Sequence, residues 1–152
     1  MDDNPERPRV YLAGPEVFFP DTVEQGAEKK RLCAEDGFEG VYPLDNIIDG
    51  VEHLPRQELA RRISHGNERL IRSCDLLIAN CTPFRSIAMD VGTSFEIGFM
   101  QALGRHVRRC LDRARRLTVA RLRHWEPVGP RLCHGAPHVL GARPRFTQRS
   151  IP

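Results

Sequence analysis

The segment DLLIANC, residues 75–81, decides the fold class. A short apolar run without polar alternation is typical of a strand that is buried on both faces of a parallel sheet. A similar run in RVYLAGP (9–15) ends in the turn dipeptide Gly-Pro, and a third in GVYPL (40–44) is stopped by Pro43. The sequence therefore predicts three buried strands at these positions.

Helical patterns lie between and after these runs. We expect helices over residues 23–37, which end in a glycine typical of a C-cap, over 56–74, and over 93–104. The middle helix has apolar residues along one face (Leu59, Ile63, Leu70, Ile71 and Cys74). Alternating strands and helices predict a doubly wound α/β fold, flavodoxin- or Rossmann-like, with a parallel sheet and helices on both faces.

Ligands of such sheets bind at the carboxyl ends of the strands. Three loops meet there: residues 14–21, the turn with Asp45 and Asn46, and the loop that leads to Asp90 and Glu96. No GxGxxG follows the first strand, and no GxxxxGK[ST] occurs, so a dinucleotide or P-loop site lacks its phosphate cradle.

Composition points to an ordinary globular chain. Of 152 residues, 40% are hydrophobic and 28% charged, and no apolar run approaches the roughly 18 residues that a membrane span requires. Five cysteines without a CxxC pair suggest neither a disulfide framework nor a metal site. Together with a polar, acidic N-terminus, these features predict a cytoplasmic protein.

The stretch DVGTSFEIG (90–98) supports two interpretations of Glu96. TSFE matches a capping box, in which Thr93 caps a helix and Glu96 reaches back to its backbone. However, Glu96 shares a helical face with Met100 and Leu103, which should be buried. A carboxylate on that face would have a raised pKa, and clustered carboxylates at a ligand edge are suited to cleaving a glycosidic bond.

Three segments together resemble the nucleoside 2-deoxyribosyltransferase family. They are VYLAGPEVFFPD (10–21), NERLIRSCDLLIANCTPFR (67–85) and DVGTSFEIGFMQALGR (90–105), the last with an intact Asp-x-Gly-Thr-x-x-Glu signature. The resemblance covers about residues 9–105, implies the fold already described, and defines a first domain over 1–105.

The resemblance implies roles for particular residues. Glu96 corresponds to the nucleophile, which attacks C1′ and forms a covalent deoxyribosyl-enzyme. Asp75 and Asp90 correspond to acids near the leaving base, and Tyr11 to a tyrosine that orients the nucleophile. Further substrate-binding residues are Gly14 and Pro15 in the floor of the base pocket, Phe18 or Phe19 against the base, Asn46 and Thr93.

Ordinary structural roles remain open for several of them. Asp75 is also typical of a turn, as is Asn46. Tyr11 is also typical of a core aromatic with a satisfied hydroxyl. At least one of Phe18 and Phe19 should pack against the protein, since neighbouring strand residues face opposite ways.

The family transfers a 2-deoxyribosyl group between nucleobases. For this chain the resemblance implies deoxynucleosides and nucleobases as substrates, a role in nucleoside salvage, no metal or organic cofactor, and a homo-oligomer. One alternative is a hydrolase of 2′-deoxynucleoside 5′-phosphates, with water as the acceptor. Another is a non-catalytic protein that binds nucleotides or nucleic acid through a basic tail.

That tail is the last third of the chain. Residues 105–152 hold 12 arginines against two acids, a formal net charge of +10, whereas residues 1–104 carry −7. We treat 106–152 as an atypical Arg/Pro-rich segment with three interpretations: a basic amphipathic helix from Val107, which would bind nucleic acid, a disordered cationic tail, or an altered reading frame. The abrupt loss of acids and of family pattern favours the third, which the coding DNA would test.

Overall fold

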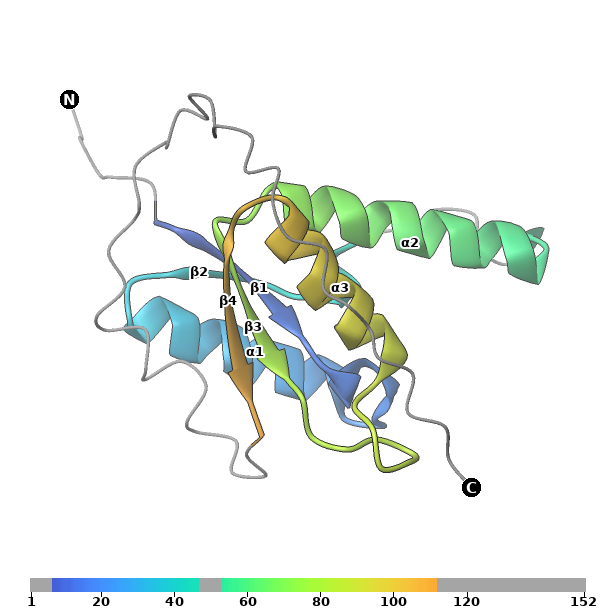
Figure 1. Cartoon of the computed structure of the whole chain (residues 1–152), viewed down its shortest axis with the longest axis horizontal. Coiled ribbons are helices and arrows are strands. Elements are labelled where there is room, and N and C mark those ends of the chain that lie inside the picture. The colour runs from blue at the N-terminus through green and yellow to red at the C-terminus, as the bar shows by residue number, and fades with distance from the viewer. Residues whose placement is uncertain (1–6, 47–52, 112–152) are drawn as a thin grey trace, which may run out of the picture.

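The computed structural model describes residues 7–46 and 53–111, which form a layered α/β domain (Figure 1). Each strand and helix expected before residue 105 is present, with ends that differ by a few residues. The strands are β1 (Arg9–Ala13), β2 (Glu39–Val41), β3 (Leu76–Asn80) and β4 (His106–Cys110); the helices are α1 (Thr22–Glu35), α2 (Arg56–Arg72) and α3 (Val91–Ala102); and two 3₁₀ turns are η1 (Pro15–Phe18) and η2 (Pro43–Asp45).

The four strands form one parallel sheet in the order β2-β1-β3-β4. In the register of the central strand, Tyr11 is paired with Val41 of β2 and with Leu77 of β3. From β1 the chain runs to β2 on one side and then crosses to β3 on the other. The order therefore reverses between β1 and β3, and their carboxyl ends mark the crevice where such sheets bind ligands.

Helices cover both faces of the sheet, which confirms the predicted fold class (Figure 1). On one face, β1 and β3 pack against α2 and α3 through Tyr11, Ile71, Leu77, Ile97 and Met100. On the other face, the alternate strand residues pack against α1 and the segment that follows it (Val10, Leu12, Cys33, Phe38, Leu76 and Ile78). This double burial explains the near-continuous apolar runs of β1 and β3.

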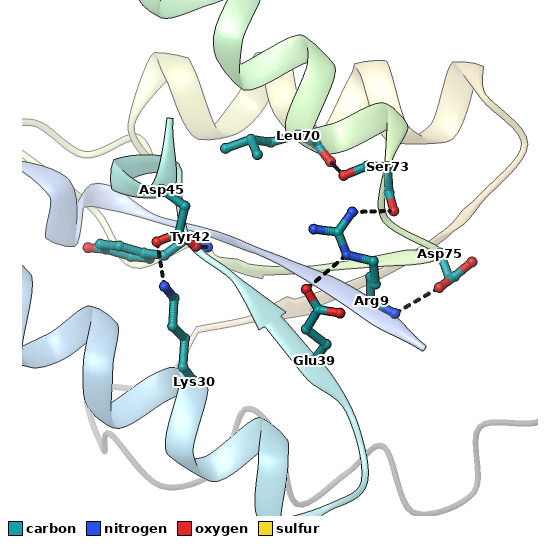
Figure 2. Close-up of polar contacts among 8 residues, drawn as sticks. All are labelled: Arg9, Lys30, Glu39, Tyr42, Asp45, Leu70, Ser73 and Asp75. Carbon is teal, nitrogen blue, oxygen red and sulfur yellow. Dashed lines mark hydrogen bonds and ion pairs between the residues drawn. The ribbon is translucent and has the colours of Figure 1, made fainter. Parts of the chain in front are cut away.

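The amino edge of the sheet is tied together by polar contacts of Arg9 (Figure 2). Its backbone N–H donates to Asp75 at 2.7 Å, and its guanidinium donates to Glu39 and to the backbone carbonyl of Ser73, both at 3.1 Å. These contacts join the starts of β1, β2 and β3. At the opposite, carboxyl end of β2, Asp45 of η2 pairs with Lys30 and accepts from the backbone N–H of Tyr42 (Figure 2).

Arg105 closes the end of α2, and its removal should destabilise the fold. The Nη1 atom of Arg105 donates to the backbone carbonyls of Ile71 and Arg72 at the end of α2 and to that of Cys74 just beyond it. We expect Arg105→Ala to lower the free energy of unfolding by about 2 kcal/mol in urea titrations. The control Arg108→Ala, at an exposed position of β4, should change it by less than about 0.5 kcal/mol.

The sheet continues past residue 105, where the sequence placed the end of the first domain. β4 begins at His106 and pairs with the whole of β3. A helix from Val107 is wrong for residues 106–110, because they form this strand. Residues 112–152 lie outside the described residues. The other two interpretations of the basic segment, a disordered cationic tail and an altered reading frame, fall mainly on these residues. Within the described ranges, no helix is long and apolar enough to cross a membrane.

Candidate active site

A buried tyrosine–glutamate pair lies between the sheet and α3. The hydroxyl of Tyr11 donates to Oε1 of Glu96 at 2.7 Å, and the two side chains are 0% and 8% exposed. The residues are 85 positions apart in the sequence and meet because β1 and α3 pack face to face. No hydrogen bond joins Oε2 of Glu96 to the described part of the chain.

The helix start decides where Glu96 points. The N-cap of α3 is Asp90, whose carboxylate accepts from the backbone N–H of Thr93 at 2.8 Å and from its hydroxyl at 3.0 Å. The capping box with Thr93 as the cap is therefore wrong. With Thr93 inside the first turn and bonded to Asp90, Glu96 is not required at the helix end and turns inward to Tyr11.

The environment of Glu96 shifts its acidity. Burial raises the pKa of Glu96 to about 7, with a further contribution from the negative charge of Asp90, while the hydrogen bond from Tyr11 acts in the opposite direction. Burial also raises the pKa of Tyr11, as does the neighbouring Glu96 charge, so the phenol stays protonated and donates. Near neutral pH, Glu96 is therefore present in comparable amounts as carboxylate and carboxylic acid.

Most predicted residues lie at the carboxyl edge. Tyr11, Asp90, Thr93 and Glu96 form the cluster just described, and Gly14 and Pro15 follow β1 directly. Phe18, in η1, is half-exposed, and its ring is stacked on Phe84. Asn46 lies beside α2, where its amide donates to the carbonyl of Ile63 at 3.4 Å and fills the space that a Cβ on Gly66 would take.

Asp75 is not brought to this site. It directly precedes β3 and therefore lies at the amino edge of the parallel sheet, opposite to the edge where β3 ends (Figure 2). There it accepts a hydrogen bond from the backbone of Arg9. The structure gives Asp75 the turn-like, structural role that the residue type also allowed, and a role near a leaving base does not fit its place in the fold.

Sequence reasoning missed a second buried acid at the carboxyl edge. Glu16 of η1 is 6% exposed, and its Oε1 accepts from Lys29 of α1 at 2.7 Å and from Asn80 at 2.9 Å. Asn80 in turn accepts from the backbone and hydroxyl of Thr82. A Cβ on Gly14 would overlap Oε2 of Glu16, so a larger residue there would displace this carboxylate. An acid within the apolar stretch GPEVFF was the available signal.

Asn67 of α2 was also missed. Its Oδ1 atom is buried and has no hydrogen-bond partner within residues 7–46 and 53–111. It lies one helical turn before Ile71, which packs in the same core as Tyr11 and Ile97. The available signal was its position on the apolar face of the helix, four residues after Ile63 and four before Ile71. An unpaired buried acceptor of this kind is available to a ligand donor.

No metal centre is evident in the described ranges, where no three His, Cys, Asp or Glu side chains are grouped to hold an ion. The site thus consists of carboxylates, one phenol and loop residues at the carboxyl ends of β1 and β3. A doubly wound domain with such a tyrosine–glutamate pair is suited to reactions in which a carboxylate attacks an electrophilic carbon.

Comparison with known proteins places the chain in a family. Residues 10–131 match the nucleoside 2-deoxyribosyltransferase family, and the chain belongs to it. The resemblance noted in the sequence is thereby confirmed, but its end at about residue 105 is wrong, because the match continues to residue 131 and so into the basic segment.

Three known proteins are similar to the chain in sequence or in fold. A 2-desoxiribosyltransferase from Leishmania mexicana is 35% identical, with a TM-score of 0.55 over 67% of this chain and 63% of that chain. A 2-deoxyribosyltransferase from Bacillus psychrosaccharolyticus shares the fold at 20% identity, with a TM-score of 0.52 over 66% of this chain and 70% of that chain. An uncharacterized protein from Schizosaccharomyces pombe is 40% identical over 100 residues, which are 64% of this chain and 47% of that protein. The chain therefore spans about half the length of this yeast relative.

Proposed function

We propose that the protein transfers a 2-deoxyribosyl group between nucleobases, with Glu96 as the nucleophile. The observation that carries the proposal is the buried pair in which Tyr11 donates to Oε1 of Glu96, while Oε2 accepts from no residue within 7–46 and 53–111. Hydrogen bonding fixes the carboxylate, and partial burial leaves it weakly solvated. Both effects suit a nucleophile that must approach a sugar carbon in one orientation.

The reaction has two steps. In the first, an oxygen of ionised Glu96 bonds to C1′ as the bond from C1′ to the base nitrogen breaks, and the base leaves with a proton on a ring nitrogen. In the second, a ring nitrogen of another base attacks C1′, loses its proton, and releases Glu96. Two inversions give overall retention and ping-pong kinetics. The absence of a 2′-hydroxyl on the sugar favours the oxocarbenium-like transition state.

The neighbouring residues have supporting roles in this proposal. Asp90 fixes the start of α3 through Thr93 and faces the same site, so we assign it to the sugar hydroxyls or to the proton of the leaving base. Asn67 offers its unpaired carbonyl to an N–H or O–H of the substrate. Gly14, Pro15 and Phe18 border the base at the end of β1.

Incubation of the purified protein with thymidine and adenine tests the proposal. Chromatography should show deoxyadenosine and free thymine in equal amounts. If thymine forms at the same rate without adenine, water is the acceptor, which favours a hydrolase over a transferase; a hydrolase that requires a 5′-phosphate would release thymine from thymidine 5′-phosphate alone. If neither product forms at any pH from about 6 to about 9, the proposed function is wrong.

We also propose a homo-oligomer, with α3 as the contact surface. Its outer face presents Val91, 82% exposed, and Phe95, 52% exposed and stacked on Phe99 at 5.8 Å. The loop before it exposes Ile87 completely. An apolar stripe next to a site is typical of a surface that a partner subunit covers.

A charge on this stripe should separate the subunits. We expect Phe95→Glu to convert the oligomer to a monomer in size-exclusion chromatography with light scattering, because the interface would bury an unpaired carboxylate. The matched control Val23→Glu places the same charge at an exposed apolar position of α1 and should leave the mass unchanged. A wild-type protein that is already monomeric at micromolar concentration would refute the interface.

A further inference from the structure

A buried polar clamp joins the loops that follow β1 and β3. Glu16 of η1 is buried, and its Oε1 atom accepts from the side-chain amide of Asn80, the last residue of β3, at 2.9 Å. The Oδ1 atom of Asn80 accepts from the backbone N–H of Thr82 at 3.0 Å and from its hydroxyl at 2.6 Å. These three residues, which we call the Glu16 clamp, connect the two loops across the carboxyl ends of β1 and β3.

Glu16 decides which way the amide of Asn80 faces. A carboxylate accepts hydrogen bonds and does not donate them, so the NH₂ end of the amide lies toward Glu16 and its oxygen toward Thr82. Without this carboxylate, the amide would be free to turn and to present its own donors to those of Thr82. Glu16 therefore holds the start of loop 81–89 in place through Asn80.

The acid at position 16 is costly for the fold. Its Oε2 atom is buried and has no hydrogen-bond partner in the described part of the chain, while its Oε1 pairs with Lys29 of α1 at 2.7 Å. A buried carboxylate with an unpaired oxygen generally destabilises a protein relative to an apolar side chain that fills the same space. Packing alone therefore does not explain Glu16, and its contact with Asn80 indicates a second role.

The clamp borders the crevice between β1 and β3. A Cβ on Gly14, the residue after β1, would lie 3.1 Å from the Cβ of Asn80 and would overlap the carboxylate of Glu16. Gly14 in turn lies three residues after Tyr11, which donates to Glu96. The clamp therefore sets where the chain runs as it leaves the strand that carries Tyr11.

The same two loops also meet through aromatic rings. Phe18 lies two residues after Glu16, and its ring is stacked on that of Phe84 in loop 81–89, with centroids 5.4 Å apart. Phe18 is half-exposed, whereas Glu16 is buried beneath it in the sequence of contacts to α1 and β3. A shift at the buried clamp would therefore also displace the ring that borders the proposed base site.

We propose that Glu16 is a positioning residue for substrate binding, because through Asn80 it keeps loops 14–19 and 81–89 in the arrangement that receives the base. The proposal rests on the proposed function and adds a residue that determines substrate affinity. Glu16 pairs with α1, whereas Glu96 lies on the other face of the sheet, where α3 packs. Loss of Glu16 should therefore weaken substrate binding without changing the chemical step at Glu96.

Steady-state kinetics with thymidine and adenine tests the proposal. We expect Glu16→Ala to raise KM for thymidine at least about tenfold, while kcat stays within about threefold and the acidic limb of the pH–rate profile stays in place. Glu16→Gln should keep KM within about threefold of wild type, because its amide oxygen accepts from Asn80 and fixes the same orientation. Asn80→Ala should raise KM as Glu16→Ala does, and the double variant should be no worse than either single variant.

Lys29→Met separates positioning from stability. This variant removes the ion pair but leaves the hydrogen bond between Glu16 and Asn80, so its melting temperature should fall, as in Glu16→Ala, while its KM stays that of wild type. An unchanged KM in Glu16→Ala would overturn the proposal. So would an equal rise of KM in Lys29→Met, because the effect would then follow stability rather than the orientation of Asn80.

Calorimetry and amide hydrogen exchange test the clamp without turnover. Glu16→Ala should weaken thymidine binding at least about tenfold and reduce the protection of the Thr82 amide, while the amides of α3 stay protected. If both changes occur but wild type transfers no deoxyribosyl group, the proposed function is wrong and the positioning role stands. Unchanged affinity and protection in an active enzyme would refute the positioning role alone, and a wild type that binds neither thymidine nor adenine would refute both.

Discussion

Glu96→Gln should abolish exchange between thymidine and adenine, with a rate lowered by more than about a thousandfold. The amide keeps the shape of the side chain and its hydrogen bond from Tyr11 but is too weak a nucleophile to bond to C1′. Mass spectrometry of wild type with a deoxynucleoside should show a deoxyribosyl adduct on the peptide that contains Glu96. The adduct should be absent from the variant.

The fold of this variant should be intact. Because burial raises the pKa of Glu96 to about 7, the folded state favours its protonated form, and ionisation of Glu96 costs stability as pH rises from its ordinary value of 4.5 through 7. At pH 8, Glu96→Gln should therefore be as stable as wild type, or more stable by up to about 3 kcal/mol. Glu24→Gln, on the exposed surface of α1, is the matched control and should keep full activity. Exchange by Glu96→Gln at the wild-type rate would rule out the mechanism.

Tyr11→Phe should lower kcat/KM by about tenfold to a hundredfold and change its pH dependence. Only ionised Glu96 can attack C1′, so the rate of wild type should fall as pH decreases below about 7. The hydrogen bond from Tyr11 lowers the pKa of Glu96. Its loss should move this limb of the pH–rate profile to higher pH.

Tyr42→Phe is the control for this result. Tyr42 is also buried, but its hydroxyl contacts Thr22 at 3.1 Å and its ring lies on the face of the sheet covered by α1. The substitution removes the same atom without touching Glu96, so the pH profile should be unchanged. The acidic limb of the pH–rate profile could instead stay in place in Tyr11→Phe, or move equally in Tyr42→Phe. Either result would show that the hydrogen bond from Tyr11 does not set the pKa of Glu96.

The strands and helices could be predicted because the patterns that specify them lie within short segments of the sequence. Apolar runs in β1 and β3 reflect burial on two faces, and the glycines at 37 and 104 end α1 and α3 with positive φ. The start of α3 was ambiguous, since Asp90 and Thr93 are both good caps three residues apart. Only the packed structure shows that Asp90 is the cap and that Glu96 is free to turn inward.

The site was predictable only in part. Contacts between distant residues, such as Glu16 with Lys29 and Asn80, have no periodic signal and required coordinates. Asp75 was assigned to the site although it directly precedes β3. A residue that precedes a strand lies at the amino edge of a parallel sheet, opposite to the edge where ligands bind. Glu96 was indicated by its own position on a buried helical face, whereas its pairing with Tyr11 was expected only from the family resemblance, because a separation of 85 positions leaves no local pattern.

Tyr11 belongs to two parts of the molecule at once. Its ring is packed in the core with β3 and the helices α2 and α3, while its hydroxyl donates to Glu96, the proposed nucleophile. Any change in packing around the ring would also move its hydroxyl and reorient Glu96. Substitutions that alter the proposed chemical step in this way would therefore also affect the stability of the domain. New substrate ranges in this architecture would therefore arise in the loops 14–19 and 81–89, which can vary while the reacting centre stays fixed.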